Sequence, residues 1–350
     1  MAQSALATKP VTVLVKNVYH LMSYAFNAVD VREYRTLEAE DFSGMDDLLA
    51  AILLLGIESQ RRRGLERDYQ PVRERGWRIK GRIDMGSTMR LQMSGRAEVA
   101  YVYDEYTEDT LCNRILKISA LILSGSGEVS SSRRRRLHGA LAYLQGVSPI
   151  ADPARIPWNT LRYHRNNRSY QMLMGVCYLV IQRQLMGVRE GERHLAVFDD
   201  RQSFSALFER FLLNYYRRHF PELDPKGQRE VKPGPDAPSF LPAMYEDVVL
   251  THGDRTLIID AKCYGRIFSM RFDQPRLSAE HVRQIFYYAI HTGSPENTSA
   301  LLVYAGTEEG HVAETWCDQG YEMGCVTLDL NRGFAEIRKQ LDDIPKRLAR

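Results

Sequence analysis

The sequence has no stretch long and apolar enough to predict a membrane span. Its longest apolar run, residues 48–55, is less than half of the ~20 residues that a transmembrane helix needs. Five cysteines are present, but none is spaced as Cys-x-x-Cys, so neither a disulfide framework nor a zinc site is indicated. The N-terminal residues lack the layout of a signal peptide. These absences predict a cytoplasmic protein with no membrane partner.

Two motif absences exclude further classes of activity. No G-x-x-x-x-G-K-[ST] occurs, and the glycines of SGSGE at 124–128 are followed by no lysine, so the chain has no Walker A loop and no motor of its own. The N-terminal half also lacks a DNA-recognition motif such as a zinc finger, which argues against autonomous targeting of DNA.

The positive charges are clustered although the net charge is small. Lysine and arginine total 47 against 44 acidic residues, a formal net charge of +3. Arginines gather at 61–63, 73–82, 133–136 and 162–168. Such clusters suit phosphates or an acidic partner, and a solvated surface is the alternative for each cluster taken singly.

Hydrophobic periodicity predicts two domains in the 350 residues. Residues 1–190 are predicted to form an α+β domain of helices with a basic β module at about 61–104, including a strand over 89–95. Residues 191–350 are predicted to form an α/β domain, a mixed sheet flanked by helices. The stretch 224–238, which contains KPGPDAP, is predicted to be a loop.

The most informative stretch is 244–264, MYEDVVLTHGDRTLIIDAKCY. It predicts a hairpin of strands 247–250 and 256–262 around a turn that contains Gly253. Side chains alternate along a strand, so Asp260 and Lys262 share one face. A strand apolar on both faces is usually buried, and an acid and a lysine at its end need partners or a metal.

If the two strands pair, Asp247 lies beside Asp260. Two carboxylates suit Mg2+, and the backbone carbonyl of Ala261 is a further candidate ligand. Lys262 can orient or deprotonate a water, or stabilise charge on phosphorus. Glu246 stays open as an alternative first ligand, and a structural Asp–Lys pair in an ordinary buried hairpin remains the simpler interpretation of D-x-K.

Two predicted helices flank this hairpin. Glu209, on a helix over 203–219, is either a surface salt-bridge residue or one more acid of the site. Gln284 and Tyr288, four apart on a helix over 277–291, share a face. They are either polar surface residues or partners of DNA phosphate or of the lysine.

The pattern Asp247, Asp260, Lys262 resembles the motif of the PD-(D/E)XK nuclease superfamily. It departs from that motif in one respect, since Glu246 and not a proline precedes Asp247. The whole chain resembles the McrC family, the nuclease subunits of McrBC methylation-dependent restriction systems. The stretches that carry this resemblance are VLVKNVYHLMSYAF (13–26), RRGLERDY (62–69), IKGRID (79–84), EDTLCNRILK (108–117) and LPAMYEDVVL…LIIDAKCYGRIF (241–268).

The resemblance implies a Mg2+-dependent endonuclease in the C-terminal domain, with a restriction-endonuclease-like fold. It implies that the N-terminal domain docks into a hexameric AAA+ GTPase, McrB-like, and stimulates it, while that partner recognises methylated double-stranded DNA. The sequence leaves open whether two such complexes meet to cut both DNA strands. The residues expected at the partner contact are Arg61, Arg62, Arg63, Arg73, Arg75, Arg78, Lys80 and Arg82. A catalytically silent adaptor and a stand-alone nuclease are the alternatives.

Overall fold

The computed structural model describes residues 11–27, 37, 40–164, 167–186, 195–198, 201–231, 240, 242–264, 267–271, 274–305 and 310–349. The chain divides into two compact units, Met1–Leu48 with Glu190–Arg350, and Leu49–Arg189. The predicted boundary between residues 190 and 191 lies next to the change of unit at Glu190. The predicted grouping of residues 1–48 with the N-terminal domain does not agree, because they join the C-terminal unit.

Contacts across almost the whole sequence explain this grouping. Strand β1 (Val11–Leu14) pairs antiparallel with β5 (Leu195–Phe198). Helix α1 (Val15–Ala25) packs on α8 (Arg201–His219), and the side-chain amide of its buried Asn17 donates to the carbonyl oxygen of Leu330 at 2.7 Å. Local periodicity predicts that α1 is a helix, but it cannot predict such a distant partner.

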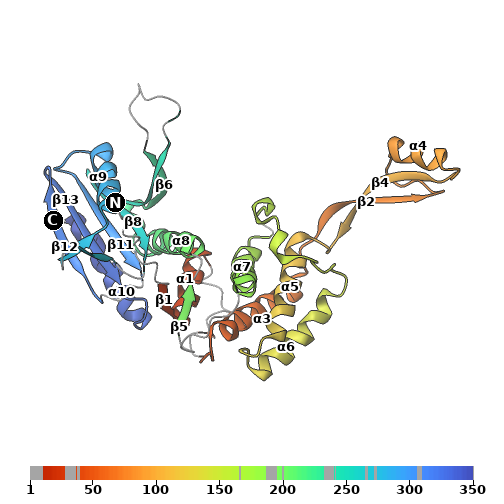
Figure 1. Ribbon diagram of the computed structural model, residues 1–350, viewed down its shortest axis with the longest axis horizontal. Helices are drawn as coiled ribbons and strands as arrows, with labels where there is room; N and C mark the ends of the chain where they lie inside the picture. Colours follow the sequence, from red (N-terminus) through yellow and green to blue (C-terminus); the bar gives the residue numbers. More distant parts are fainter. Residues whose placement is uncertain are drawn as a thin grey trace. The chain divides into compact units, whose positions relative to one another are not determined.

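The first unit is built on a six-stranded mixed sheet, drawn in green to blue in Figure 1. Its strands are β6 (Lys226–Val231), β7 (Met244–His252), β8 (Arg255–Cys263), β11 (Thr298–Ala305), β12 (Ala313–Asp318) and β13 (Tyr321–Leu328). The spatial order is β12-β13-β11-β8-β7-β6, and β11 runs parallel to both β8 and β13. A mixed sheet is therefore present as predicted, but β6 occupies part of the stretch 224–238 that was predicted to be a loop.

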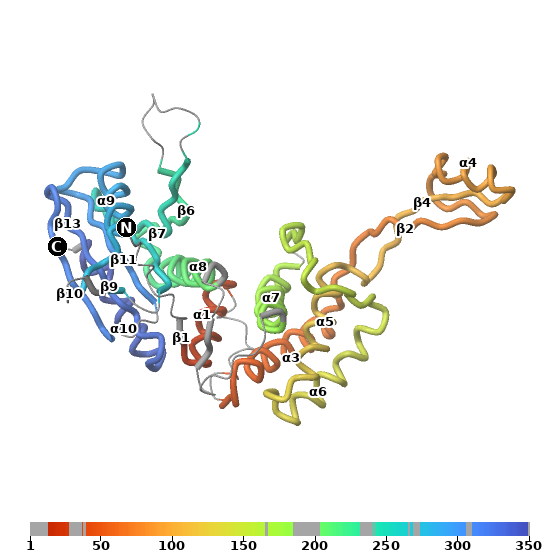
Figure 2. Tube along the Cα trace, viewed as in Figure 1, coloured from red at the N-terminus to blue at the C-terminus, as the bar shows by residue number. Residues whose placement is uncertain are grey.

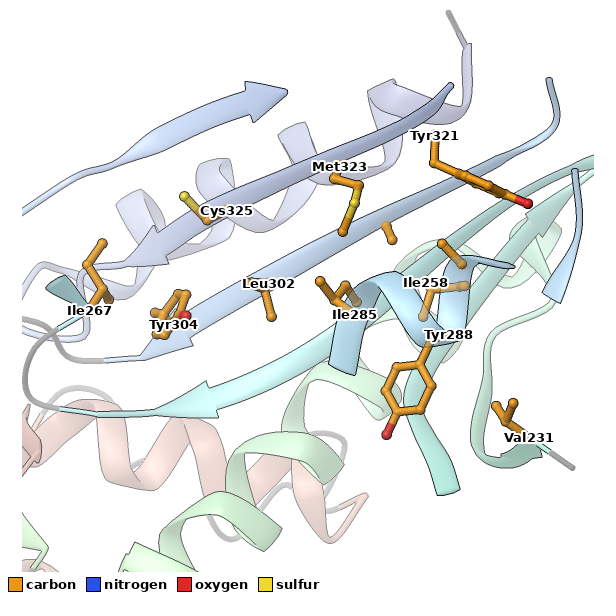
Figure 3. Packing of buried hydrophobic residues seen from close by; sticks show 12 residues of the cluster. Val231, Ile258, Ile267, Ile285, Tyr288, Leu302, Tyr304, Tyr321, Met323 and Cys325 are labelled. Atoms are coloured by element: carbon orange, nitrogen blue, oxygen red, sulfur yellow. The ribbon is translucent and has the colours of Figure 1, made fainter. Parts of the chain in front are cut away.

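Helices cover both faces of this sheet. Helix α9 (Ala279–Thr292) packs its Ile285 against Ile258 of β8 and Leu302 of β11 in one buried cluster, shown in Figure 3. Helix α8 and the C-terminal 3-10 helix η6 (Ile344–Ala349) contact β7 and β8. The unit also contains α10 (Phe334–Asp343), η5 (Pro221–Leu223) and the hairpin β9 (Phe268–Arg271) with β10 (Gln274–Leu277). The ends of β7 and β8 thus lie beside α8 and α9.

The second unit combines helices with a small sheet. Its elements are α3 (Met45–Arg63, which begins at the junction), β2 (Asp68–Gly76), β3 (Arg82–Ile83), α4 (Met85–Met93), β4 (Val99–Thr107), α5 (Leu111–Gly125), α6 (Ser131–Leu141), η2 (Ala142–Leu144), η3 (Pro153–Arg155), η4 (Trp158–Thr160) and α7 (Tyr170–Met186). The sheet order β2-β4-β3 confirms a β module. The predicted strand at 89–95 is wrong, because Asp84 caps a helix there by accepting from the backbone N–H of Ser87.

Strands β2 and β4 form a long ribbon that leaves the helices and carries α4 at its far end (Figures 1 and 2). We call residues 68–107 the arm. A buried polar network holds its base: the side-chain amide of Asn113 donates to the carbonyl oxygens of Glu66 and Glu108 at 2.9 and 2.7 Å. The Tyr170 hydroxyl donates to Asn113 at 2.6 Å. Because buried amides are costly without partners, this network fixes where the arm leaves the helices.

Among the helices of the described ranges, none has both the length and the apolar character of a transmembrane span.

Candidate active site

The site forms where the pairing of β7 with β8 ends. The hairpin pairs from His252↔Arg255, at a turn in which Gly253 has φ +62°, to Val248↔Ile259. Beyond that pair the Asp247 carboxylate accepts a hydrogen bond from the backbone N–H of Ala261 at 2.8 Å. A side chain thus replaces the main-chain bond that would continue the ladder. Asp247 and Asp260 are the next residues on either strand, which places the two predicted acids together.

Lys262 joins these acids, as predicted. Its Nζ lies 2.7 Å from Oδ2 of Asp260, and the two side chains are only 12% and 1% exposed. Among the described residues, the ammonium group of Lys262 is the charged partner of the buried Oδ2 of Asp260. A buried carboxylate oxygen in this state is suited to a cation.

Helix α9 supplies the partner of the lysine. Nζ of Lys262 donates to Oε1 of Gln284 at 2.9 Å, and Nε2 of Gln284 lies 2.8 Å from the Tyr288 hydroxyl. That hydroxyl donates to the backbone carbonyl of Tyr245 at 2.8 Å, and burial raises the pKa of Tyr288 to about 12, so the donor keeps its proton. Figure 3 shows the hydroxyl directed away from the apolar cluster. Gln284 therefore contacts the lysine directly and Tyr288 contacts Gln284, while contact with a DNA phosphate stays a prediction.

The carboxylates of the site have raised pKa values. Burial, and then the charges of Asp260 and Glu209, raise the pKa of Asp247 to about 8. Burial also raises the pKa of Asp260, against the opposing effect of Lys262. Neighbouring acids in a buried site resist joint ionisation unless a cation compensates them. Asp247 and Asp260 are therefore suited to a divalent cation, and the binding of Mg2+ stays a prediction.

Glu209 lies within electrostatic range of this pair. Burial, and then the charge of Asp260, raise its pKa. The side-chain amide of Gln228 donates to Glu209 at 3.4 Å, and none of the ion pairs in the described part of the chain includes Glu209. This placement favours the site over a surface salt bridge. However, no group of three His, Cys, Asp or Glu side chains arranged to hold a metal occurs among the described residues, so Glu209 does not complete a ligand set here.

The neighbouring Glu246 has a different environment from Asp247. Its side chain is fully buried and forms a two-point ion pair with Arg229, with Nε to Oε2 at 2.5 Å and Nη2 to Oε1 at 3.1 Å. The hydroxyl of Thr292 also donates to Oε1 at 2.6 Å. With both oxygens engaged, Glu246 is unsuited to ligate a metal. This geometry favours Asp247 over Glu246 as the first metal ligand, and metal binding by Asp247 stays a prediction.

Strand β6 is distorted opposite Asp247. The pairing of β6 with β7 passes from Gly227↔Val248 to Arg229↔Glu246, and Gln228 between them has φ +52°. Gly227 lies beside it, and a Cβ there would lie 2.3 Å from the end of the Leu213 side chain of α8, which would have to move. Irregular strands next to a site commonly redirect side chains. Here the distortion brings Gln228 to Glu209.

The predicted partner-binding residues lie in two places in the second unit. Arg61, Arg62 and Arg63 form the exposed last turn of α3, and the Arg61 guanidinium donates to the Tyr143 hydroxyl at 2.6 Å. The others lie on the arm: Arg73, Arg75, Arg78, Lys80 and Arg82. The arm also has a groove of about 640 Å³ lined by Arg73, Arg75 and Arg90 together with Glu74, Asp84, Ser87, Leu91, Ala100 and Tyr101.

Sequence reasoning missed an apolar surface on the arm. Three methionines of α4 are exposed at four-residue spacing, Met85 by 64%, Met89 by 58% and Met93 by 87%. Trp77, between β2 and β3, is 75% exposed. Thr88 is the only buried residue of α4 among the described residues, so the methionine face is turned to solvent. The i, i+4, i+8 spacing was the available signal, and exposed apolar patches of this kind mark interaction sites.

These features define a mixed α/β protein: a part with helices and a small sheet, and a six-stranded mixed sheet with helices on its faces and two acids and a lysine at the end of one hairpin. The chain belongs to the family described as McrBC 5-methylcytosine restriction system component, which it matches over residues 12–305. The resemblance predicted from the sequence is thereby confirmed at the level of the family.

Individual relatives agree with this assignment. The chain is 28% identical over 341 residues to the Type IV methyl-directed restriction enzyme EcoKMcrBC of Escherichia coli (strain K12), which covers 94% of this chain and 96% of that protein. The fold of the present chain is similar to that of a chain in the half-complex of Thermococcus gammatolerans McrB AAA+ hexamers with bound McrC. That match has a TM-score of 0.50 and 16% identity, and covers 94% of this chain and 76% of the other.

Proposed function

We propose that this protein is the Mg2+-dependent DNA endonuclease subunit of a GTP-driven restriction complex that acts on modified cytosine. The observation that carries the proposal is the convergence of Asp247, Asp260 and Lys262 beyond the last pair of the β7–β8 ladder. The order of acid, acid and lysine on a hairpin of a helix-flanked mixed sheet is that of a PD-(D/E)XK nuclease fold. Family membership and the full-length match to a restriction enzyme support the same activity.

Asp247 and Asp260 are the residues that would hold Mg2+. The backbone carbonyl of Ala261 is a third candidate, because its N–H already points to β7, and the N–H and C=O of one strand residue point to the same neighbour. When bound, the ion supplies charge neutralisation at the phosphate and a water of lowered pKa.

The protein's own groups then align the reaction. Lys262 Nζ, between Asp260 and Gln284, orients the attacking water or stabilises the charge that develops on the phosphate. Gln284 fixes the direction of that ammonium group, and Tyr288 fixes the amide of Gln284. Glu209 adds negative potential beside the acids, which favours binding of a cation there.

We also propose that the second unit binds and stimulates a hexameric AAA+ GTPase, and that this partner recognises the methylated DNA. The chain has no Walker A loop, so a GTP-driven complex needs a second protein. The arm supports docking in two ways, through the exposed methionines of α4 and through the cations of β2 and β3. The McrC chain that this fold resembles is bound to McrB AAA+ hexamers.

The test is cleavage of a methylated plasmid with Mg2+ and GTP. Wild-type protein is assayed alone and with its AAA+ partner, and Asp260→Ala and Lys262→Ala are assayed in the complete mixture. The matched control is Lys346→Ala, an exposed lysine that forms a surface ion pair with Asp343. We expect cutting by the complete wild-type and control mixtures, a loss of about 10²–10³-fold in both site variants, and unchanged GTPase stimulation.

The other outcomes identify the alternatives. Cutting by wild-type protein without its partner would mark an autonomous nuclease. If GTP hydrolysis is stimulated but neither the wild type nor any variant cuts DNA, the protein is an adaptor that has lost nuclease activity. Cutting by Lys262→Ala at the wild-type rate would show that the site is assigned to the wrong residues.

A further inference from the structure

Three polar residues form a stripe along α9, spaced four apart: Gln284, Tyr288 and Thr292. Residues at this spacing lie on one face of a helix. The first bonds Lys262 of β8, the second bonds the carbonyl of Tyr245 of β7, and the third bonds the carboxylate of Glu246 of β7. The sequence singled out Gln284 and Tyr288 but not Thr292, one turn further on.

The contact of Thr292 is part of a closed buried network. Its hydroxyl donates to Oε1 of Glu246 at 2.6 Å and accepts from Nη2 of Arg229 at 2.8 Å. Glu246 is 0% exposed, and Arg229 pairs with both of its oxygens. A carboxylate buried this deeply needs every one of these partners, so the network allows little variation in where Glu246 lies.

Glu246 immediately precedes Asp247, and the ladder does not hold this part of β7 on β8. Pairing with β8 stops at Val248, and pairing with β6 is interrupted at Gln228. The two residues before Asp247 pair with β6, at Arg229↔Glu246 and Glu230↔Tyr245, and they are also bonded to α9, Tyr245 through its carbonyl and Glu246 through its side chain. Because successive side chains of a strand point to opposite faces, fixing Glu246 on one side fixes Asp247 on the other.

We propose that Thr292 and Arg229 are positioning residues for the metal-binding acid, acting through Glu246. They keep Asp247 directed at Asp260, while the other end of the same helical stripe keeps Lys262 in place. Helix α9 thereby sets the distance between the acid of β7 and the lysine of β8. This inference rests on the proposed nuclease function and adds two residues to its machinery.

The test uses Thr292→Val, which keeps the shape and removes the hydroxyl, and Thr292→Ser, which returns a hydroxyl. The matched control is Thr315→Val, an exposed threonine on edge strand β12. Binding of Mn2+ to the full-length protein without DNA is measured from the electron paramagnetic resonance signal of free Mn2+, and cleavage is measured in the complete mixture. Loss of such supporting partners commonly weakens metal binding or activity by about 10–100-fold.

We expect that loss for Thr292→Val in both measurements, recovery of most of it in Thr292→Ser, and no change in Thr315→Val. A Thr292→Val protein that melts at a lower temperature but binds Mn2+ and cuts as the wild type does would overturn the proposal. If Thr292→Val does not fold, Arg229→Lys decides, since it keeps the charge but loses the two-point contact and is expected to weaken Mn2+ binding. Wild-type protein that neither binds Mn2+ nor cuts refutes the proposed function and this inference together.

Discussion

The carboxylate of Asp247 accepts the backbone N–H of Ala261 at 2.8 Å, at the point where β7 stops pairing with β8. This contact satisfies the backbone N–H of Ala261 in place of a main-chain bond and holds one acid beside the other, so a single side chain serves both the sheet and the site. The two roles of Asp247 can be separated by experiment. An asparagine side chain at this position can accept the same hydrogen bond from Ala261 without carrying a negative charge.

Asp247→Asn is therefore expected to stabilise the metal-free protein while abolishing cleavage. The pKa of Asp247 is raised from 3.8 to about 8, so the folded state holds a proton that the unfolded state releases. Stability of the metal-free wild type thus falls as the pH rises from about 4 to about 8. Replacing this carboxylate by a neutral amide is expected to add on the order of 4 kcal/mol to the free energy of unfolding at pH 7.

Thermal melting from pH 4 to pH 9, with and without Mg2+, measures both effects. The melting temperature of the wild type should decline with rising pH and recover when Mg2+ is added, whereas that of Asp247→Asn should do neither to the same extent. Parallel curves for the two proteins in the absence of metal would contradict the buried, raised-pKa acid.

Gln284 and Tyr288 are expected to act as one unit on Lys262. Gln284→Ala removes the side-chain oxygen that accepts a hydrogen bond from Nζ, and Tyr288→Phe removes the bond that orients the amide. Each variant is expected to lower kcat by about 10–100-fold. The double variant should lose no more than Gln284→Ala alone, since residues in one network are not additive.

Single-turnover cleavage by the wild type, the two single variants and the double variant measures the coupling between Gln284 and Tyr288 directly. If the two losses multiply, Tyr288 has a separate role, such as contact with a DNA phosphate. Gln284→Glu is a useful companion, because a carboxylate keeps an acceptor for Lys262 but adds negative charge to a site already rich in it.

The methionine stripe of α4 is expected to contribute to partner binding and not to cleavage chemistry. Met89→Gln together with Met93→Gln keeps good helix formers and removes exposed apolar surface. The concentration needed for half-maximal GTPase stimulation should rise about tenfold or more, as for losses of ~1–2 kcal/mol at interfaces. Mn2+ binding should not change.

The control for this variant is Leu121→Gln, an apolar residue of α5 that is 40% exposed outside the arm. It should leave stimulation unchanged. An unchanged titration for the methionine variant would remove α4 from the docking surface and leave the cations of β2 and β3 as the contact.

The sequence predicted the hairpin and its three chemical groups because those signals are local. A glycine turn and alternating apolar residues specify β7 and β8, and their register then brings Asp247 and Asp260 together. Gln284 and Tyr288 were found for the same reason, since spacing along one helix is readable without a partner.

What could not be predicted depends on distant contacts. Strand β6 has a weak pattern of its own and is a strand because β7 pairs with it. Helix α1 has a clear pattern, but nothing local indicates that it packs on α8. The burial of Glu246 likewise depends on Arg229 and Thr292, residues 17 and 46 positions away. Thr292 alone had a local signal, its place four residues after Tyr288.

Gly56 tests packing in the second unit, where two physical effects oppose each other. It lies in the interior of α3, so alanine would be favoured by about 0.5–1 kcal/mol from helix propensity. However, a Cβ at this position would lie 1.9 Å from Cδ2 of Leu173 on α7, a side chain that is 0% exposed. Overpacking of this kind typically costs about 1–3 kcal/mol, so the clash should outweigh the gain.

Gly56→Ala is therefore expected to lower the free energy of unfolding by about 1–2 kcal/mol. Gly139→Ala is its control, because Gly139 lies in helix α6 with nothing within 4 Å of the added Cβ. That variant should gain about 0.5–1 kcal/mol. Urea unfolding of both proteins measures the two signs, and stabilisation by Gly56→Ala would show that α3 and α7 can separate enough to accept a methyl group.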